Sequence, residues 1–394
     1  MATLRSVDKA VNIADLRRLA KRRLPRIVFD YADGGAEDEI TLRDNCRVFD
    51  TITLRPRNGV LAPRADLRTT VLGTTFDLPF LLAPIGSTRM FHPHGEGLSA
   101  SAAGAAGAGY ILSTLSGSPL EEVKAAATRP VWYQLYLVGG HDVARAGIER
   151  ARAAGFSALV VTIDTPIGGM RERDHRNGTS ELLTRKLGPM LPFIPQLLAR
   201  PRWLARFVAD GGLMHFPNVL LPTGPMAYAE VGDALQQCAV AWADLRWIRD
   251  AWTGPIVVKG VHTADDARRA VDAGAEGIVV SNHGGRQLDG VAATLRILPE
   301  VVAAVGDRTE VLLDGGIRRG SDIVKAIALG ARAVLVGRAY VYGLGAGGGP
   351  GVTRAIEILR ADLVRTLRLL GCGSTTELDQ SFLELPNGWP AASR

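Results

Sequence analysis

The sequence predicts a single closed barrel of eight parallel β-strands with α-helices between them. Three observations support this fold class: short apolar runs alternate with segments of helical periodicity from residue 78 onward, eight such runs occur, and many of the helical segments end just before a glycine. Eight strands that alternate with helices favour a closed (β/α)8 barrel over an open doubly wound sheet. In such a barrel the active residues gather at the carboxyl ends of the strands.

The eight predicted strands and the helices between them can be assigned in order. The strands are expected at residues 78–86, 110–115, 131–138, 158–166, 255–261, 277–284, 310–316 and 333–339. Helices are expected between them, and the clearest are at residues 142–154, 264–273, 294–305 and 322–329. These four segments combine good helix formers with helical spacing of apolar residues, and each is followed by a glycine that can cap the helix.

Two regions fall outside this alternation. Residues 1–77 predict one or two amphipathic helices and a turn-rich entry with Asp33-Gly34-Gly35, which we interpret as a cap packed against the barrel. An insertion over 167–228 follows the fourth strand and is long for a connection inside a compact domain. With a barrel over 78–371 and a tail over 372–394, we expect one domain, although the length alone would allow two or three.

The insertion mixes apolar and basic side chains in a way that is unusual for a solvated loop. Its apolar members include Leu182, Leu183, Leu187, Met190, Phe193, Ile194, Leu197, Leu198, Trp203, Leu204 and Phe207, and its basic members include Arg185, Lys186, Arg200, Arg202 and Arg206. Apolar residues beside basic ones are typical of an interfacial membrane anchor, here within residues 178–228. A connection of this length can equally be a lid over the active site or an oligomer contact.

Composition and charge narrow the class of protein. The chain is 47% hydrophobic and 22% charged, as in an ordinary globular protein, and its three cysteines lack the spacing of a disulfide framework or a zinc site. A net charge of +6 would suit anionic substrates, anionic lipids or nucleic acid. The interleaved aromatic and basic residues expected of a nucleic-acid binder are absent, so we expect no nucleic-acid partner.

The sequence also predicts where the protein resides. Charged residues interrupt any apolar core that a signal peptide would need near the N-terminus, and no apolar stretch reaches the ~18 residues of a spanning helix. The sparse, separated cysteines fit a reducing compartment. We therefore expect a cytoplasmic protein, with any membrane contact peripheral and on the inner face of the cell membrane.

The segment Ser-Asn-His-Gly-Gly-Arg at 281–286 is the strongest chemical signal, because it directly follows the apolar run 277–280. His283 can change its charge near neutral pH, whereas Arg286 stays cationic and presents a planar fork that grips a carboxylate. The glycines between them let the backbone turn sharply and approach a ligand. The pattern indicates proton abstraction from a substrate that carries a carboxylate.

Polar residues also end the other predicted strands, and together they predict a cofactor site. The strand-end residues are Pro84-Ile85-Gly86, Ser113 and Leu115, Gln134-Leu135-Tyr136, Thr162-Ile163-Asp164 and Lys259. The last two strands end in Asp314-Gly315-Gly316 before Arg318 and in Gly337-Arg338, which matches the phosphate site that many barrels build there. The number of convergent polar groups indicates a phosphate-bearing cofactor rather than a small phosphorylated substrate. No metal site is expected.

Nearly the whole chain resembles one enzyme family. The resembling pieces are Asp30-Tyr31, Gly34 to Glu39, Gln134-Leu135-Tyr136, Asp164-Thr165-Pro166, Lys259-Gly260, Ser281 to Asp289, Asp314 to Arg319 and Gly337-Arg338. By these motifs the chain is similar to the flavin mononucleotide (FMN)-dependent 2-hydroxy-acid oxidases and dehydrogenases, which include glycolate oxidase, L-lactate dehydrogenase and mandelate dehydrogenase. The resemblance implies FMN as cofactor, oxidation of an (S)-2-hydroxy acid to the 2-oxo acid and, as is common in the family, a homotetramer.

The resemblance also assigns roles to individual residues. The catalytic and substrate residues that it implies are His283 as base, Asp164 as the orienting partner of that base, Arg171 and Arg286 as carboxylate clamps, and Tyr31 and Tyr136 as hydroxyl contacts. Lys259 would lie beside the pyrimidine edge of the flavin and stabilise negative charge on the reduced ring. The implied cofactor contacts are Pro84, Ile85, Gly86, Ser113, Gln134, Thr162, Lys259, Ser281, Asp314, Gly315, Gly316, Ile317, Arg318, Gly337 and Arg338.

Two departures from the glycolate oxidase pattern point to a larger substrate. Gly86 stands where the short-chain oxidases have an alanine beside the flavin, and Leu115 stands where they have a large aromatic residue over the substrate. Both changes open the site. We therefore expect L-lactate, a longer aliphatic 2-hydroxy acid or a mandelate-like acid as substrate.

The electron acceptor is a further expectation. The chain resembles the membrane-associated dehydrogenases at Gly86 and in the segments 168–174 and 244–250. This resemblance favours a quinone, or another electron acceptor that is not oxygen. The alternatives are an oxidase that uses oxygen and releases hydrogen peroxide, and a flavin-dependent isomerase on the same barrel. An isomerase would not need His283 together with both Arg171 and Arg286.

Overall fold

The computed structural model describes residues 6–62, 64–179 and 187–389, and it is built around a closed barrel of eight parallel strands. In chain order the strands are β4 (Phe80–Leu82), β5 (Gly109–Ser113), β6 (Val131–Leu135), β7 (Ala158–Thr162), β10 (Ile256–Val261), β11 (Gly277–Val280), β12 (Glu310–Asp314) and β13 (Ala333–Val336). The last strand, β13, pairs with β4 and closes the barrel. All eight predicted strands are present, and the predicted fold class is confirmed.

Several of the predicted strands extend past the observed ends. The fourth, expected at 158–166, ends at Thr162, and the sixth, expected at 277–284, ends at Val280. The residues beyond these ends form loops at the carboxyl rim of the barrel, and Asp164 and His283 lie on those loops. The predicted catalytic side chains therefore stand on short loops that are positioned by the strands before them.

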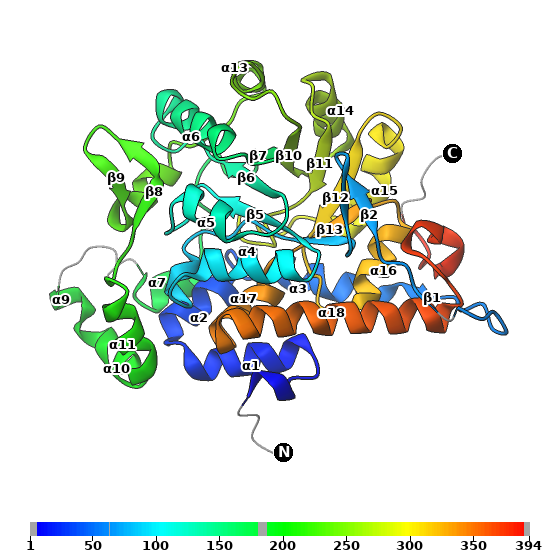
Figure 1. Ribbon diagram of the computed structural model, residues 1–394, viewed down its shortest axis with the longest axis horizontal. Helices are drawn as coiled ribbons and strands as arrows, with labels where there is room; N and C mark the ends of the chain where they lie inside the picture. Colours follow the sequence, from blue (N-terminus) through cyan, green and yellow to red (C-terminus); the bar gives the residue numbers. More distant parts are fainter. Residues whose placement is uncertain (1–5, 63, 180–186, 390–394) are drawn as a thin grey trace.

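Helices lie around the strands on the outside of the barrel (Figure 1). They are α4 (Gly95–Ala105), α5 (Leu120–Ala126), α6 (His141–Ala153), α13 (Asp244–Ala251), α14 (Ala264–Asp272), α15 (Thr294–Val305), α16 (Gly320–Ala328), α17 (Arg338–Gly347) and α18 (Gly349–Leu370). The four clearest helix predictions correspond to α6, α14, α15 and α16 and are confirmed to within two residues at each end. α14 begins where the Thr263 hydroxyl accepts a hydrogen bond from the Asp266 N–H (3.1 Å), a typical N-cap.

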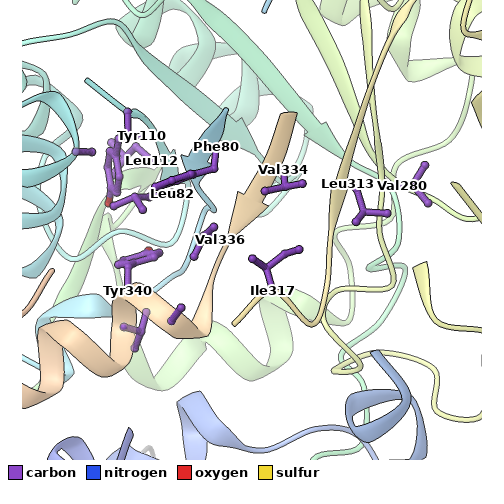
Figure 2. Close-up of a cluster of buried hydrophobic side chains, with 14 of the residues drawn as sticks. Phe80, Leu82, Tyr110, Leu112, Val280, Leu313, Ile317, Val334, Val336 and Tyr340 are labelled. Carbon is purple, nitrogen blue, oxygen red and sulfur yellow. The ribbon is translucent and has the colours of Figure 1, made fainter. Parts of the chain in front are cut away.

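Side chains of the strands are buried on both faces of the sheet, which explains the continuous apolar runs in the sequence. One buried cluster takes a side chain from every strand and fills the barrel interior: Leu81, Ile111, Trp132, Val160, Val257, Val279, Leu312 and Leu335. The neighbouring residues along the same strands point outward and pack under the helices, among them Phe80, Leu82, Leu112, Val280, Leu313, Val334 and Val336 (Figure 2). This alternation follows from the two-residue repeat of a strand.

Residues 6–54 form a cap next to the last two helices. The cap contains η1 (Val7–Lys9), α1 (Ile13–Arg23), α2 (Arg26–Asp33), α3 (Ile40–Arg47), η2 (Val48–Thr51) and β1 (Thr53–Leu54). α1 packs against α17, and α17 packs against α18, so these helices lie side by side (Figure 1). After α18 the chain forms η6 (Thr375–Glu377), η7 (Gln380–Phe382) and β14 (Leu383–Glu384), and β14 pairs with β1. The hairpin of β2 (Thr69–Val71) and β3 (Thr74–Phe76) lies between the cap and the barrel in the sequence and contributes Val71 and Phe76 to the interior cluster.

The insertion projects from one side of the barrel (Figure 1). Its described elements are α7 (Glu172–Arg176), α9 (Leu187–Met190), η4 (Leu191–Phe193), α10 (Ile194–Leu198), α11 (Pro201–Ala209), β8 (His215–Leu221), β9 (Gly224–Ala227), η5 (Tyr228–Glu230) and, directly after the predicted end, α12 (Val231–Leu235). Leu182, Leu183, Arg185 and Lys186, which the sequence analysis placed in the apolar and basic mixture, lie outside the described residues. Within the described residues, no helix combines the length and apolar character needed to cross a bilayer.

Candidate active site

One cavity at the carboxyl rim of the barrel collects most of the predicted site residues. It has a volume of about 150 Å³ and is lined by residues of the cap, the strand ends and the insertion. The predicted residues that line it are Tyr31, Pro84, Ile85, Gly86, Ser113, Leu115, Tyr136, Arg171, Lys259, His283, Arg286, Asp314, Gly315, Gly316, Ile317, Arg318, Gly337 and Arg338. Residues more than 300 positions apart in the sequence therefore meet at one place.

The four remaining predicted residues, Gln134, Thr162, Asp164 and Ser281, contact this lining without being part of it. The Gln134 amide donates a hydrogen bond to the Thr162 hydroxyl at 3.1 Å and accepts one from the Ser113 hydroxyl at 3.0 Å. The Lys259 ammonium donates to the Ser281 hydroxyl at 2.9 Å. Polar side chains from five neighbouring strands or strand ends thus form a hydrogen-bonded layer under the cavity, which we call its floor. Direct contact of Gln134, Thr162 and Ser281 with a cofactor stays a prediction.

His283 is held between a carboxylate and a phenol. Its Nδ1 lies 3.0 Å from Asp164 Oδ1, and its Nε2 lies 3.3 Å from the Tyr136 hydroxyl. A carboxylate at Nδ1 favours the tautomer whose N–H is on that nitrogen, which leaves the Nε2 lone pair toward the cavity. The backbone of His283 has a positive φ of 55°, rare for a side-chain-bearing residue, and the Ser281 hydroxyl accepts its N–H at 3.1 Å. The imidazole is therefore held in one orientation by contacts on several sides.

The surroundings of His283 favour its neutral form. Burial lowers the pKa of His283 below its ordinary value, and the charges of Lys259 and Arg171 act in the same direction, while Asp164 opposes them. Burial alone would raise the pKa of Asp164, but His283 and Lys259 outweigh it, so the pKa of this carboxyl is lowered and it stays ionised. A neutral imidazole beside a fixed carboxylate is the arrangement that a general base requires.

Two arginines, Arg171 and Arg286, stand beside this base, and among the described residues neither forms an ion pair. Asp174 is near enough to interact with both, but burial raises the pKa of its carboxyl. The Arg286 guanidinium donates to the carbonyl oxygens of Tyr31 (2.6 Å) and Gly34 (3.0 Å), and it lies over the Tyr31 ring. Burial and the charge of Arg171 lower the pKa of Arg286 to about 10. Arg171 Nε is buried and lacks a hydrogen-bond partner among the described residues. Two mutually repelling cations with an unused N–H donor fit an anionic ligand such as a carboxylate.

Gln287 fixes the loop that carries Arg171. Its amide nitrogen donates to the carbonyl oxygens of Asp164 (3.0 Å) and Ile167 (2.8 Å). Its amide oxygen accepts from the Gly169 N–H (3.2 Å) and, at the longer distance of 3.5 Å, from Arg171. A Cβ at Gly169 would come within 2.8 Å of the Gln287 backbone, so the two chain segments are in direct contact. Gln287 therefore sets where the insertion begins relative to the loop that carries Arg286.

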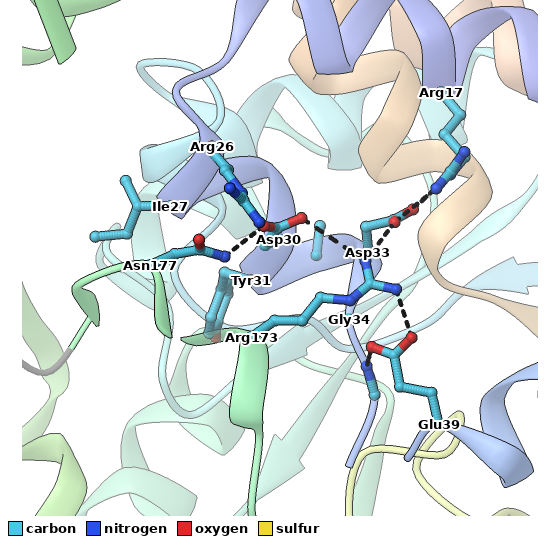
Figure 3. Close-up of polar contacts among 12 residues, drawn as sticks. Arg17, Arg26, Ile27, Asp30, Tyr31, Asp33, Gly34, Glu39, Arg173 and Asn177 are labelled. Carbon is cyan, nitrogen blue, oxygen red and sulfur yellow. Dashed lines mark hydrogen bonds and ion pairs between the residues drawn. The ribbon is translucent and has the colours of Figure 1, made fainter. Parts of the chain in front are cut away.

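A network of ion pairs joins the start of the insertion to the cap (Figure 3). Arg173 pairs with Asp33 at 3.0 Å and with Glu39, and Arg17 also contacts Asp33. Burial would raise the pKa of Asp33, but hydrogen bonds from Arg17, Tyr342 and Arg173 lower it to about 2. Because Arg173 is only two residues from Arg171, this network of ion pairs also restrains the position of Arg171.

The floor of the cavity has a buried ion pair with spare hydrogen-bonding capacity. Lys259 Nζ lies 3.0 Å from Asp314 Oδ2, and Asp314 Oδ1 is buried without a hydrogen-bond partner among the described residues. Burial alone would lower the pKa of Lys259, but Asp314 and Asp164 outweigh it and the pKa is raised. Lys259 therefore stays protonated in the cavity lining, close enough to His283 for its charge to lower the pKa of that residue.

The ends of β12 and β13 have the features of a phosphate site. Arg318 and Arg338 line the cavity there and, among the described residues, neither forms an ion pair; Arg338 donates to the carbonyl oxygens of Ala32, Gly34 and Gly284. Gly315 and Gly316 have positive φ, and a Cβ at Gly316 would overlap the carbonyl oxygen of Asn45. The helix α17 begins at Arg338, so its N-terminus adds positive potential. Guanidinium groups, a close backbone turn and a helix N-terminus would suit a phosphate group such as that of FMN.

Some cavity residues were missed by the sequence analysis. Thr165, Ile167 and Gly168 follow β7, Leu235 belongs to α12, and Gln287 follows Arg286. Leu235 could not be found from the sequence, because it reaches the cavity from the far end of the insertion. Gln287 did carry a signal, since it lies inside the motif 281–289 and directly follows a predicted clamp.

Comparisons with known proteins agree with this geometry. A family model described as FMN-dependent dehydrogenase matches residues 20–385. An L-lactate oxidase from Nostoc sp. is 43% identical over 96% of this chain and 100% of its own length, and a putative L-lactate dehydrogenase from Mycobacterium tuberculosis is 44% identical over 95% and 89%. The crystal structure of (S)-mandelate dehydrogenase, described as a monotopic membrane protein, superposes with a TM-score of 0.89 and 37% identity over 96% of this chain and 100% of that one.

Proposed function

Since this chain belongs to the FMN-dependent dehydrogenase family and is an FMN-dependent 2-hydroxy-acid oxidoreductase, we propose that His283 is the base that starts oxidation of an (S)-2-hydroxy acid to the 2-oxo acid. The observation that carries this proposal is the position of one imidazole. Its Nδ1 meets Asp164, its Nε2 faces the cavity beside Tyr136, and the Arg171 and Arg286 side chains line the same cavity.

The residues divide the work of the reaction among them. Arg171 and Arg286 hold the substrate carboxylate, which presents the α-carbon and its hydroxyl to His283. His283 accepts a proton at Nε2, and Asp164 stabilises the imidazolium that forms. When bound, FMN supplies the acceptor for the two electrons and the second proton that the oxidation removes from the substrate. The ammonium of Lys259 gives positive charge to the cavity floor, which offsets negative charge that develops above it.

The substrate is proposed to be L-lactate or a larger 2-hydroxy acid. Gly86 lines the cavity, and a Cβ there would lie 3.0 Å from Leu115 Cβ, so a side chain at position 86 would press against the leucine that forms part of the cavity wall. Leu115, Ile167 and Leu235 give the same cavity an apolar wall that a substrate side chain can contact. The relatives are named for lactate and mandelate, which supports both ends of this size range.

We propose that the electron acceptor is a quinone or another compound that is not oxygen, and that the protein meets this acceptor at a membrane surface. Leu191, Leu198 and Val208 are each more than 60% exposed, and they lie in the same part of the insertion as Arg200, Arg202 and Arg206. Exposed apolar side chains beside arginines suit the boundary of an anionic bilayer. The second candidate is an oxidase that reduces oxygen to hydrogen peroxide, which the similarity to an L-lactate oxidase favours. A homotetramer stays a prediction.

One anaerobic experiment tests the base. The purified yellow holoenzyme should lose its flavin absorbance at ~450 nm on addition of (S)-lactate or (S)-mandelate, and H283Q should retain flavin but bleach ~10²- to 10⁴-fold more slowly. Near-normal bleaching by H283Q would show that another group takes the proton. Reoxidation of the bleached enzyme by oxygen and by a short-chain quinone then separates the two acceptor candidates.

A further inference from the structure

A second cavity, which we name the arginine cavity, lies apart from the active site, between the cap and the insertion. Its volume is about 460 Å³. It is lined by the end of α1, the loop after η3 (Thr88–Met90), the end of α17, and α11 of the insertion. Its charged members are Arg22, Arg23, Arg89, Arg200, Arg202 and Arg206, joined by His92, and none of its lining residues is acidic.

Three arginines on or beside α11 bring positive charge into this cavity without an ion pair among the described residues. Arg89 is neutralised by Asp210 at 2.7 Å, whereas Arg200, Arg202 and Arg206 form no ion pair with an acidic side chain among the described residues. Burial lowers the pKa of Arg23, and the charges of Arg206 and Arg202 lower it further. These cations are therefore close enough to repel one another, and an anion that entered the cavity would relieve the repulsion.

A second hollow adjoins the arginine cavity at Arg200. That hollow has a volume of about 630 Å³ and shares Leu24 and Arg200 with the arginine cavity. It adds the cations Lys21, Arg26, Arg173 and Arg176, with Asp30 as its acidic member. Arg200 is fixed at the junction because its Nε donates to the Leu24 carbonyl oxygen at 3.2 Å. The other arginines of this hollow are paired with carboxylates, Arg26 with Asp30, Arg173 with Asp33 and Arg176 with Glu172. The hollow therefore adds little net positive charge, in contrast to Arg200, Arg202 and Arg206 of the arginine cavity.

Apolar side chains lie next to the arginines, and they indicate which class of anion suits the cavity. The Trp203 and Phe207 rings stack at 4.7 Å and line the cavity, and the Trp203 N–H donates to the Met90 carbonyl oxygen at 2.8 Å. Leu198 and Val208 directly adjoin lining residues in the sequence and are 62% and 65% exposed. A soluble anion would use the arginines and leave these side chains in water, whereas an amphiphile would use both.

We propose that the arginine cavity binds the phosphodiester headgroup of an anionic phospholipid. Guanidinium groups pair with phosphate oxygens in a bidentate manner, and a basic pocket beside apolar side chains suits a headgroup whose acyl chains remain in the bilayer. A zwitterionic choline headgroup fits less well because its ammonium would face the same arginines. This inference rests on the proposed membrane contact of the insertion, and it adds the chemical class of lipid and the residues that bind it.

Cosedimentation of the holoenzyme with vesicles tests the proposal. We expect tighter binding to vesicles of equal parts phosphatidylglycerol and phosphatidylcholine than to phosphatidylcholine alone, with a loss of this preference at high salt. The double variant R202Q/R206Q should bind the anionic vesicles about 25-fold more weakly, from about fivefold for each arginine. The matched control R246Q/R268Q removes the same charge from exposed sites on α13 and α14 and should stay within about twofold of the wild type.

A third variant separates this site from membrane contact itself. L198S/V208S should weaken binding to both kinds of vesicle, and all variants should keep wild-type turnover with a soluble dye. If R202Q/R206Q bound anionic vesicles as the wild type does while L198S/V208S did not, the headgroup site would be wrong and the membrane contact would stand. Failure of the wild type to bind any vesicle would overturn both. Binding of inorganic phosphate in solution that R202Q/R206Q abolishes, with vesicle binding unchanged, would make the cavity a soluble-phosphate site.

Discussion

Gln287→Met is the substitution that most directly tests how Arg171 and Arg286, the two proposed carboxylate clamps, are positioned. Methionine preserves the length of the side chain but removes the two N–H donations to the Asp164 and Ile167 carbonyl oxygens and the acceptor for Gly169. Each such bond contributes about 0.5–1.5 kcal/mol net. Ile167 is 57% exposed, so water can replace part of its loss. We expect a decrease in the free energy of unfolding of about 2 kcal/mol.

The effect on catalysis should be larger than this loss of stability suggests. Arg171 would lose its spacing from Arg286, and misplacement of a positioning group by ~1 Å can cost ~10²-fold in rate. We expect kcat/KM to fall about 10- to 100-fold, mostly through KM, and the dissociation constant of an unreactive carboxylate, measured from the flavin spectrum, to rise by a similar factor. FMN content should be unchanged, because Gln287 does not touch Arg318 or Arg338.

Gln287→Glu is the control for this interpretation. It keeps an acceptor for the Gly169 N–H and for Arg171 but loses both donations to the carbonyl oxygens. If the donations position the loop, Q287E should lose carboxylate affinity even though its new charge attracts Arg171. Unchanged carboxylate affinity in Q287M would refute the positioning role, whatever happened to stability.

Three further predictions follow from the same geometry. Arg286→Lys should lower kcat/KM by about 10²-fold with flavin retained, because a lysine cannot bind the Tyr31 and Gly34 carbonyl oxygens and a substrate carboxylate at the same time. Steady-state kinetics with a dye as acceptor measures this, and a change below threefold would contradict it. The pKa of His283 is lowered from 6.5, and the base must be neutral, so kcat/KM should stay constant near pH 7 and fall only below pH 6.5; in D164N the fall should begin at still lower pH. The pKa of Asp33 is lowered from 3.8 to about 2, so its contribution of about 2 kcal/mol to the free energy of unfolding is present above pH 3.8 and is lost as the pH falls toward 2. D33N should therefore melt at a lower temperature than the wild type at pH 7, and its Tm should depend less on pH between pH 4 and 2.

The barrel could be predicted from the sequence because its strands are buried on both faces and its helices have clear ends. The strand ends were less accurate for a physical reason. The predicted strand runs on through 163–166, and the Ile163 N–H does bond to the Lys259 carbonyl oxygen, but the chain then leaves the sheet for the insertion. Local sequence does not encode that departure, because the partner that ends the ladder is nearly 100 residues away.

Part of the candidate site could also be predicted from the sequence, because the carboxyl ends of all the parallel strands lie at one rim of the barrel. His283, Arg286 and Lys259 could therefore be expected to meet. The parts that could not be predicted depend on tertiary contacts of the cap and insertion. Leu235 reaches the cavity from α12, and Arg173 is fixed by Asp33 and Glu39, which no periodicity in the sequence relates to it.

The insertion contributes to both proposed sites, and its anchoring explains why the two can be separated by mutation. Its first residues carry Arg171, which Gln287 and the Arg173 network fix to the barrel and the cap. Arg202 and Arg206 stand on α11, and among the described residues no hydrogen bond or ion pair joins either of them to Arg171, Arg173 or Gln287. Changes at α11 should therefore alter vesicle binding without moving the substrate arginines. A variant at Arg202 or Arg206 that raised KM with a soluble acceptor would show instead that the two ends of the insertion are mechanically coupled.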